Sequence, residues 1–591
     1  MPSPGRRSRR FWSGCSTLRW PRKGLTDGPR LTECSSVTLR RRAATVPLGA
    51  TIVPNEEAHL HRRSLLTGAA AGIAAGVAPL SRVAIAQPAR NRVLKMVPQA
   101  NLTAFDAVWT TANITRNHGY MVHDTLYGTD ASFNIRPQLA EGAVEEDDGR
   151  SVTITLRDGP RFHDGEKVRA ADAVASIQRW MKRNPIGQKL TSFVEEVVAL
   201  DDRRFRFRLK QRFPMLLSAL GTVSNSPCFI IPERLAKTDA FTQVRDNTGC
   251  GPFRFKADEF NSGSLVVYER NPTYSPTPDG TPSLTAGPKL VHFDRVEWNI
   301  ITDAATSAAA LQTGEIDWFE QPPPEIQALL KRNRQIAIEA IDPLPLVGIM
   351  RFNHLHEPFK DKKIRQALLP AISQEDYMSA IVGPEPDIYM TDVGVFTPGT
   401  PLASDVGLEP LKGPRSLDKA KALLKEAGYT NQPLRLIGPT DILAPTAMTQ
   451  VGADMLRRLG MNADIALSDW GTVVTRRTSK EPVDKGGWSM LFTSFSSFDF
   501  VDPASHGPLR GNGASAWPGW PDMPQLEKLR DDWFLAPTLD AQKAIARDMQ
   551  RVVMDELPYV PVGAYKSMTA INKNLTGRVP GFAIMWNLRR T

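Results

Sequence analysis

The sequence predicts an α/β protein with two or three lobes. Its 591 residues exceed by far the size of about 250–300 residues at which one hydrophobic core stops growing. Val152, Ile154 and Leu156 alternate with polar residues, as in a half-buried strand, and a helical pattern follows from Ala170. Residues 434–437, 448–459 and 465–467 have the patterns of strand, helix and strand, which indicates a partly parallel sheet.

The net charge of +10 belongs to the N-terminal region and not to the bulk of the chain. Residues 1–86 contain 14 Lys and Arg against 4 Asp and Glu, and the remaining residues contain 59 of each sign. A uniformly basic surface is therefore not predicted, and the high pI gives no reason to expect nucleic-acid binding.

The N-terminal region has the order of parts of an export signal. Residues 1–58 are rich in Arg, Ser, Thr and Pro, and we interpret them as disordered or as untranslated sequence before the true start. Arg62 and Arg63 precede two leucines and a short apolar run, which resembles a twin-arginine signal over residues 59–86. Ala84 and Ala86 fit an Ala-x-Ala cleavage site, so the mature chain is expected to start at Gln87.

Glycine-containing turns divide the segment around the first predicted strand. Asp148-Gly149, Asp158-Gly159-Pro160 and Asp164-Gly165 are turn signals, and Asp172 is the expected cap of the helix that follows. Further elements are expected in chain order: a strand and then a loop within 92–106, a helix 118–126, strands 205–209, 227–232 and 291–301, helices 304–313, 418–428 and 542–555, and a strand 558–562.

Four motifs in this region together resemble the signature of the family 5 solute-binding proteins of ABC importers. They are Asp147-Asp148-Gly149, Leu156-Arg157-Asp158-Gly159, Phe162-His163-Asp164-Gly165 and Ala171-Asp172-Ala173-Val174. Other family markers follow in the same order, including Glu269–Tyr274 and Gly314–Asp317. The resemblance covers about residues 92–570, and its Asp and Gly residues shape turns.

The resemblance implies a periplasmic binding protein-like fold of type II, cluster C, with two hinged lobes and an inserted subdomain. The expected division assigns 87–129, 226–342 and 571–591 to lobe I, 130–225 to the inserted subdomain and 343–570 to lobe II. Lobes of this kind close on a ligand by hinge motion.

The candidate ligand site is near residue 499. Peptide-binding members of the family carry a glycine-tryptophan pair and then an aspartate that holds the peptide ammonium group; by resemblance Asp499 takes that position, within Asp499–Pro503. Ser496 or Phe495 stands where the tryptophan would be, which argues against an ordinary di- or oligopeptide pocket. Phe495 and Phe498 are expected to form an apolar wall or to add cation–π attraction. The alternative is that Asp499 caps a turn.

Three further features are weighed from the residues themselves. Trp517 and Trp520 lie in a Gly- and Pro-rich loop, where they either bind ligand or fix the loop to the core. Cys228 and Cys250 are a candidate disulfide in an oxidising compartment. His354-x-His356 lacks a full ligand set, so neither a metal nor any cofactor is expected.

The resulting hypothesis is a periplasmic receptor that is not an enzyme. It would be soluble after signal removal and monomeric, and would bind a peptide or other small solute and deliver it to the permease subunits of an ABC transporter. Peptide, opine, amine, sugar and chelated metal remain open as solutes. The alternatives are an enzyme, for which GxSxG, HExxH, Walker and CxxC motifs are missing from the sequence, or a sensing or chaperone role of the same cleft.

We expect a chain that starts at Gln87 to fold by itself, because the preceding residues belong to the leader. A cooperative thermal transition, followed by circular dichroism, would confirm this. Aggregation of that chain, with folding restored only by the leader, would contradict it.

Overall fold

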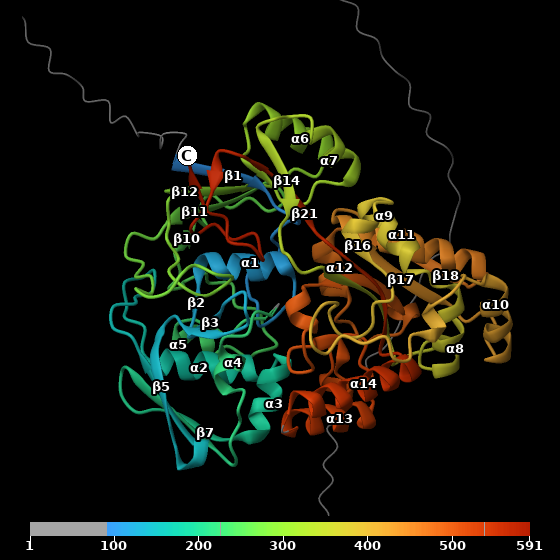
Figure 1. Cartoon of the computed structure of the whole chain (residues 1–591), viewed down its shortest axis with the longest axis horizontal. Coiled ribbons are helices and arrows are strands. Elements are labelled where there is room, and N and C mark those ends of the chain that lie inside the picture. Colours follow the sequence, from blue (N-terminus) through green and yellow to red (C-terminus); the bar gives the residue numbers. More distant parts are fainter. Residues whose placement is uncertain (1–91, 225, 537) are drawn as a thin grey trace, which may run out of the picture. The chain divides into compact units, whose positions relative to one another are not determined.

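The computed structural model describes residues 92–224, 226–536 and 538–591. The predicted extension 1–58 and the predicted signal, with Arg62, Arg63, Ala84 and Ala86, lie outside the described residues. Three sheets organise the described chain, and helices pack on them, so the α/β class is confirmed (Figure 1).

A seven-stranded mixed sheet is the core of what we call the first lobe. Its order is β10 (Phe253–Phe255), β11 (Leu265–Arg270), β12 (Arg295–Asn299), β1 (Val93–Val97), β13 (Trp318–Phe319), β21 (Met568–Asn572) and β14 (Ile336–Ala340). β1 is parallel to both of its neighbours. The strands come from three separate stretches of sequence. The expected lobe boundary at 570/571 falls inside β21, which pairs along its whole length with β14.

A six-stranded sheet is the core of the second lobe. Its order is β16 (Tyr389–Met390), β20 (Tyr559–Tyr565), β15 (Leu346–Phe352), β19 (Met490–Phe495), β17 (Leu434–Pro439) and β18 (Ala463–Ser468). β17 is parallel to β18 and is connected to it through α11 (Leu443–Leu459), so the expected strand-helix-strand unit is confirmed. The chain passes between the two lobes from β14 to β15 and from β20 to β21, and Ile341 donates its N–H to the carbonyl of Ser567 where these passages meet.

A four-stranded antiparallel sheet forms the inserted subdomain. Its order is β5 (Ala140–Glu146), β6 (Ser151–Leu156), β8 (Arg204–Leu209) and β7 (Val194–Ala199). Helix α2 (Ala170–Met181) buries Ile177 and Trp180 against it. Asp172 is not the N-cap, which is Arg169; the Asp172 carboxylate instead accepts the N–H of Arg169 at 2.8 Å and that of Glu233 at 2.7 Å.

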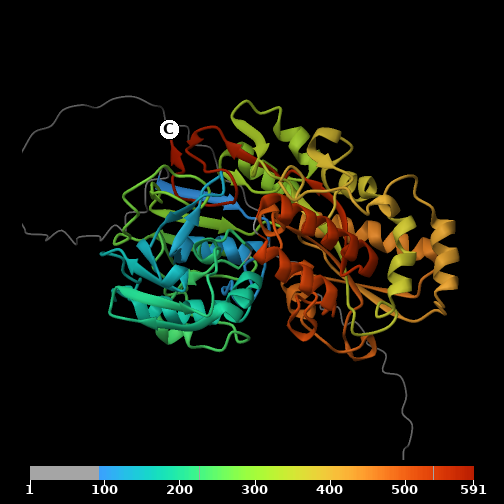
Figure 2. The same cartoon turned by 60° about the horizontal axis from the view of Figure 1, so that its bottom comes forward.

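The remaining elements surround these sheets. The other helices are α1 (Asn113–Val122), α3 (Pro185–Phe193), α4 (Leu216–Leu220), α5 (Glu233–Ala236), α6 (Ala304–Thr313), α7 (Pro324–Leu330), α8 (Lys362–Ala367), α9 (Gln374–Val382), α10 (Leu417–Glu426), α12 (Trp470–Arg476), α13 (Pro524–Leu535) and α14 (Leu539–Glu556). Short strands pair as β2 (Asp124–Thr125) with β9 (Phe229–Ile230), β3 (Tyr127–Thr129) with β4 (Ile135–Pro137), and β22 (Leu575–Thr576) with β23 (Arg589–Arg590). α13 and α14 lie side by side (Figure 2).

The helix expected over 118–126 ends earlier, at Val122. His123 is extended, and Asp124 and Thr125 pair with Ile230 and Phe229. The strand partner, distant in sequence, outcompetes the local helical pattern. Within the described part of the chain, no helix is both long and apolar enough to cross a membrane.

The candidate disulfide between Cys228 and Cys250 is not formed. Both residues are buried free cysteines. The Cys250 thiol points to the carbonyl oxygen of Ile230 at 3.8 Å, so its orientation is set by that strand and not by Cys228. Burial raises the pKa of both thiols, that of Cys250 to about 12, which keeps them protonated and unreactive.

We therefore expect the thiols of Cys228 and Cys250 to resist iodoacetamide in the folded protein and to react fully in denaturant without any reductant. Peptide mass spectrometry after each treatment measures this. A cross-linked peptide pair from unreduced protein would contradict it.

Candidate ligand-binding cleft

A cavity of about 310 Å³ lies between the first lobe with its inserted subdomain and the second lobe. One wall comes from residues 108–111 and from the end of α2 through the start of α3. The other comes from the end of α12 and from the loops that follow β19, which extend to residue 520. The volume is near the lower end of the roughly 300–1,000 Å³ typical of small-molecule sites.

Asp499 lies in this cavity wall, within a short 3₁₀ turn after β19. Asp499 is only 3% exposed, and its backbone N–H donates to the carbonyl oxygen of Ser496 at 3.0 Å. The Ser505 hydroxyl lies 3.2 Å from the carbonyl oxygen of Phe498 and fixes the far side of the turn. The next turn is held by Asp502, whose carboxylate accepts the N–H groups of Ala504 and Ser505.

Arg116 of α1 is the buried cation that interacts with Asp499. Burial lowers the pKa of Arg116, and the Asp499 carboxylate acts in the opposite direction. Glu320 and Asp342 also stabilise the charged guanidinium, which stacks 3.8 Å from the ring centre of Phe582. Among these acidic groups, Asp499 has the largest effect on the pKa of Arg116.

Three of the aromatic residues named from the sequence line the cavity with Asp499. Phe495 ends β19 and contacts Trp517 edge to face, with ring centres 5.5 Å apart. Trp517 is half-buried, and Trp520 is buried against Trp488. The tryptophan loop therefore both forms the cavity wall and packs into the core.

Ser496 and Phe498 are not among the described residues that line the cavity. Ser496 is buried at the start of the turn, where its carbonyl oxygen holds the backbone of Asp499. Phe498 packs instead between Phe133 and Phe582, each at 5.8 Å between ring centres. Its side chain supports the turn from behind because the 3₁₀ geometry directs consecutive residues to different sides.

Trp488, the tryptophan of the altered motif, is fully buried and does not line the cavity. Its indole N–H donates to the carbonyl oxygen of Arg477 at 3.0 Å. This hydrogen bond fixes the C-terminal end of α12, because Arg477 is the residue that directly follows the helix.

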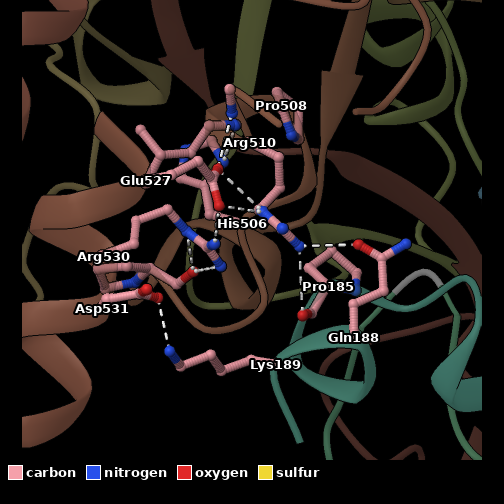
Figure 3. A network of polar contacts seen from close by, with 12 residues as sticks. Pro185, Gln188, Lys189, His506, Pro508, Arg510, Glu527, Arg530 and Asp531 are labelled. Carbon is pink, nitrogen blue, oxygen red and sulfur yellow. Dashed lines mark hydrogen bonds and ion pairs between the residues drawn. The ribbon is translucent and has the colours of Figure 1, made fainter. Parts of the chain in front are cut away.

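Side-chain contacts join the two walls. Thr111 accepts hydrogen bonds from Arg477 Nη2 at 3.2 Å and from Trp517 Nε1 at 3.4 Å. Arg510 Nη1 donates to Gln188 Oε1 at 2.9 Å, and the Lys189 ammonium lies 2.5 Å from the Asp531 carboxylate (Figure 3). The second lobe is thus in contact with α3 and with the segment before α1.

Sequence reasoning missed the cations of this cavity. Its described lining includes Lys182, Arg183, Arg477, Lys480 and Arg510. Arg476 and Arg477 are adjacent in sequence, yet Arg477 is buried and Arg476 is half-buried. Arg477 follows Val473 by four residues and Trp470 by seven, a helical spacing that places all three on one face. This spacing was the available signal, but it could not show that a second wall covers the face.

The described residues contain no cluster of three or more His, Cys, Asp or Glu that would hold a metal ion. The side chains of His354 and His356 diverge, toward the carbonyl oxygens of Pro558 and Lys480. His506 is buried against Phe500, and burial lowers its pKa to about 3.

Comparisons with known proteins agree with this architecture. Residues 134–517 match the family described as bacterial extracellular solute-binding proteins, family 5 Middle. A probable peptide ABC transporter periplasmic-binding protein, y4tO of Sinorhizobium fredii, is 37% identical over 538 residues, covering 90% of this chain and 99% of that protein. Two solved structures align over 84% of this chain and 99% of their own, at 19% identity. They are AgaA from A. tumefaciens R10 with agropinic acid, with a TM-score of 0.70, and the oligopeptide-binding AppA from Bacillus subtilis with a nonapeptide, with a TM-score of 0.69.

The chain therefore belongs to family 5 of the bacterial extracellular solute-binding proteins. Its fold is that of the type II periplasmic binding proteins, with two lobes and an inserted subdomain, as the motifs implied.

The buried carboxyl group of Glu320, whose charge acts on Arg116, leads to a prediction about stability. Burial raises the pKa of its carboxyl from 4.5 to about 7. Between these values the unfolded chain binds fewer protons than the folded protein, so the free energy of unfolding falls as the pH rises, by on the order of 3 kcal/mol for this group. Glu320→Gln keeps an acceptor for the Gln99 N–H and should remove this loss.

Urea unfolding at pH 5 and pH 8 measures the effect, with Glu315→Gln at an exposed position as the control. An E320Q variant that loses as much stability as the parent between the two pH values would contradict a protonated Glu320.

Proposed function

We propose that this protein is the solute receptor of an ABC importer. Its lobes close on a small ligand with an ammonium group, a peptide or a peptide-like compound, and it delivers this ligand unaltered to permease subunits in the membrane. It acts in the periplasm as a monomer. The observation that carries the proposal is Asp499, a carboxylate on the wall of a cavity built from both lobes.

The chemistry of the cavity supports binding of an amine. A carboxylate with little access to water attracts a cation strongly, because screening is weak. Phe495 and Trp517 add aromatic surface on the same wall. A cavity of about 310 Å³ can accept a compound of roughly dipeptide size.

The relatives support the class of solute but not one compound. The Sinorhizobium relative is named for peptides, and the two structural neighbours hold a nonapeptide and agropinic acid. Proteins of this fold thus bind peptides and also an acid that is not named as a peptide. Mass spectrometry of compounds released when the purified protein is denatured identifies the class directly.

A receptor is favoured over an enzyme because the described lining of the cavity includes neither histidine nor cysteine. A nucleophile would therefore lack the usual general base. Recovery of the bound compound unchanged after long incubation supports the receptor, and its conversion would refute it. Loss of uptake on deletion of the partner permease distinguishes transport from a sensing or chaperone role.

Asp499→Asn should weaken binding of the co-purified compound by about tenfold or more, because a charge-assisted contact is replaced by a neutral one. Isothermal titration calorimetry measures the affinity. Asp502→Asn is the matched control, since that carboxylate caps the next turn of the same loop and does not line the cavity. It should lower the melting temperature and leave affinity unchanged. Equal affinities of D499N and the parent protein would remove Asp499 from the site.

A further inference from the structure

The charges on the cavity wall are unequal. Its described lining carries five basic side chains, Lys182, Arg183, Arg477, Lys480 and Arg510, against the single acid Asp499. A site for an amine alone does not need this excess of positive charge. The excess indicates that the ligand also carries a negative group.

Three of the five cations are accounted for without a ligand. Arg510 is paired with Glu527 at 3.1 Å and binds Gln188 (Figure 3). Lys182 and Lys480 are exposed, and water solvates them. Arg183 and Arg477 remain.

Arg477 is a buried cation without a carboxylate partner. The residue is 4% exposed, and it takes part in none of the ion pairs found among the described residues. Thr111 accepts from Nη2, while Nε is buried without a hydrogen-bond partner in the described structure. A buried charge in this state is costly unless another group compensates it.

The position of Arg477 is fixed and not the result of a loose side chain. Its backbone is held by the Trp488 indole, and its guanidinium lies 5.2 Å from the ring centre of Trp517 and 5.8 Å from that of Trp470. These contacts hold the planar guanidinium of Arg477 in one position on the cavity wall. A guanidinium with this geometry is suited to bind a carboxylate through two hydrogen bonds.

Arg183 approaches the same space from the other wall. It follows α2, which Arg179 anchors to Asp106 through a buried ion pair of 2.7 Å. Its Nη2 donates to the carbonyl oxygen of Trp109 at 3.0 Å, and it too lies outside every ion pair among the described residues. The positive charge of Arg183 adds to burial in lowering the pKa of Arg477, to about 10. The two guanidinium groups therefore repel each other when the lobes are in contact.

We propose that Arg183 and Arg477 form an anion subsite that binds a carboxylate of the solute, one arginine from each wall. The proposal rests on the proposed receptor function and narrows the substrate class to zwitterionic or acidic compounds, with the ammonium group at Asp499 and the carboxylate between the arginines. The bound anion removes the repulsion between the two arginines and so stabilises the closed form.

The subsite is tested first with an anion alone. Malonate, with chloride at the same ionic strength as reference, is titrated into the ligand-free protein, and the melting temperature and tryptophan fluorescence are followed. Malonate should stabilise the protein more than chloride, and Arg477→Gln and Arg183→Gln should each weaken its binding by about tenfold. Arg477→Lys keeps the charge without the planar pair of donors and should weaken binding as well.

Arg551→Gln is the control, since Arg551 is exposed and paired with Asp548 outside the cavity, and it should bind malonate like the parent protein. Arg183 is half-buried, so R183Q is the variant that keeps the test valid if R477Q does not fold. Equal malonate affinity in R183Q and the parent protein, or no effect of malonate beyond chloride, would overturn the subsite.

The second arm uses three pools of short peptides: free C-terminal acids, C-terminal amides, and amides with one glutamate. The acid pool should bind at least about tenfold more tightly than the amide pool, with the difference reduced in R477Q. Tight binding of the glutamate pool would show that the bound carboxylate is that of a side chain, and this result would also support the subsite. Equal binding of acids and amides would refute the subsite and leave the receptor function intact. If no pool binds and no compound co-purifies, the receptor function fails, while the malonate titration still decides the anion subsite.

Discussion

Thr111 accepts two hydrogen bonds from the second lobe, and the geometry of the cavity depends on this contact. Arg477 and Trp517 donate to the same hydroxyl oxygen, at 3.2 and 3.4 Å. Thr111 lies just before α1, which carries Arg116 toward Asp499. Together with the contacts of Arg510 to Gln188 and of Lys189 to Asp531, this contact holds Arg477 and Asp499 at a fixed distance from the opposite wall. Without it, Arg477 would regain water and the charges in the cavity would be screened.

The cavity separates charges of opposite sign, and this arrangement explains how a receptor can be selective without binding too tightly. Asp499 is partly compensated by Arg116, and Arg477 is partly stabilised by aromatic rings and by Thr111. In the proposed binding mode, the charged groups of the solute would join charges that protein groups already stabilise. In that mode a solute with both charges would compensate both ends of the cavity, whereas a solute with one charge would compensate only one of them. Such a penalty discriminates between solutes more strongly than added attraction does.

Much of the fold could be predicted from local pattern. The strand at 151–156, the helix at 304–313 and the parallel unit around α11 follow from periodicity and turn residues, with end positions off by a few residues. Errors occurred where a distant partner decided the conformation, as at Asp124 and Thr125, which pair with β9. The predicted disulfide between Cys228 and Cys250 was wrong for a related reason, because spacing in sequence does not fix the direction of a thiol. At the site, Asp499, Phe495, Trp517 and Trp520 line the cavity, while Ser496 and Phe498 lie behind it.

The sequence by itself determined the family, the α/β class and the segment that holds the acidic residue, because these depend on motifs and on periodicities that are local in the chain. Only the tertiary structure decided which cations share the cavity with that acid. Arg183 and Arg477 are 294 positions apart in the numbering, and neither stands in a motif. They line one cavity because Thr111, Trp488 and the Arg179–Asp106 ion pair fix three distant segments in space. Burial and the approach of like charges arise from packing, which no local pattern records.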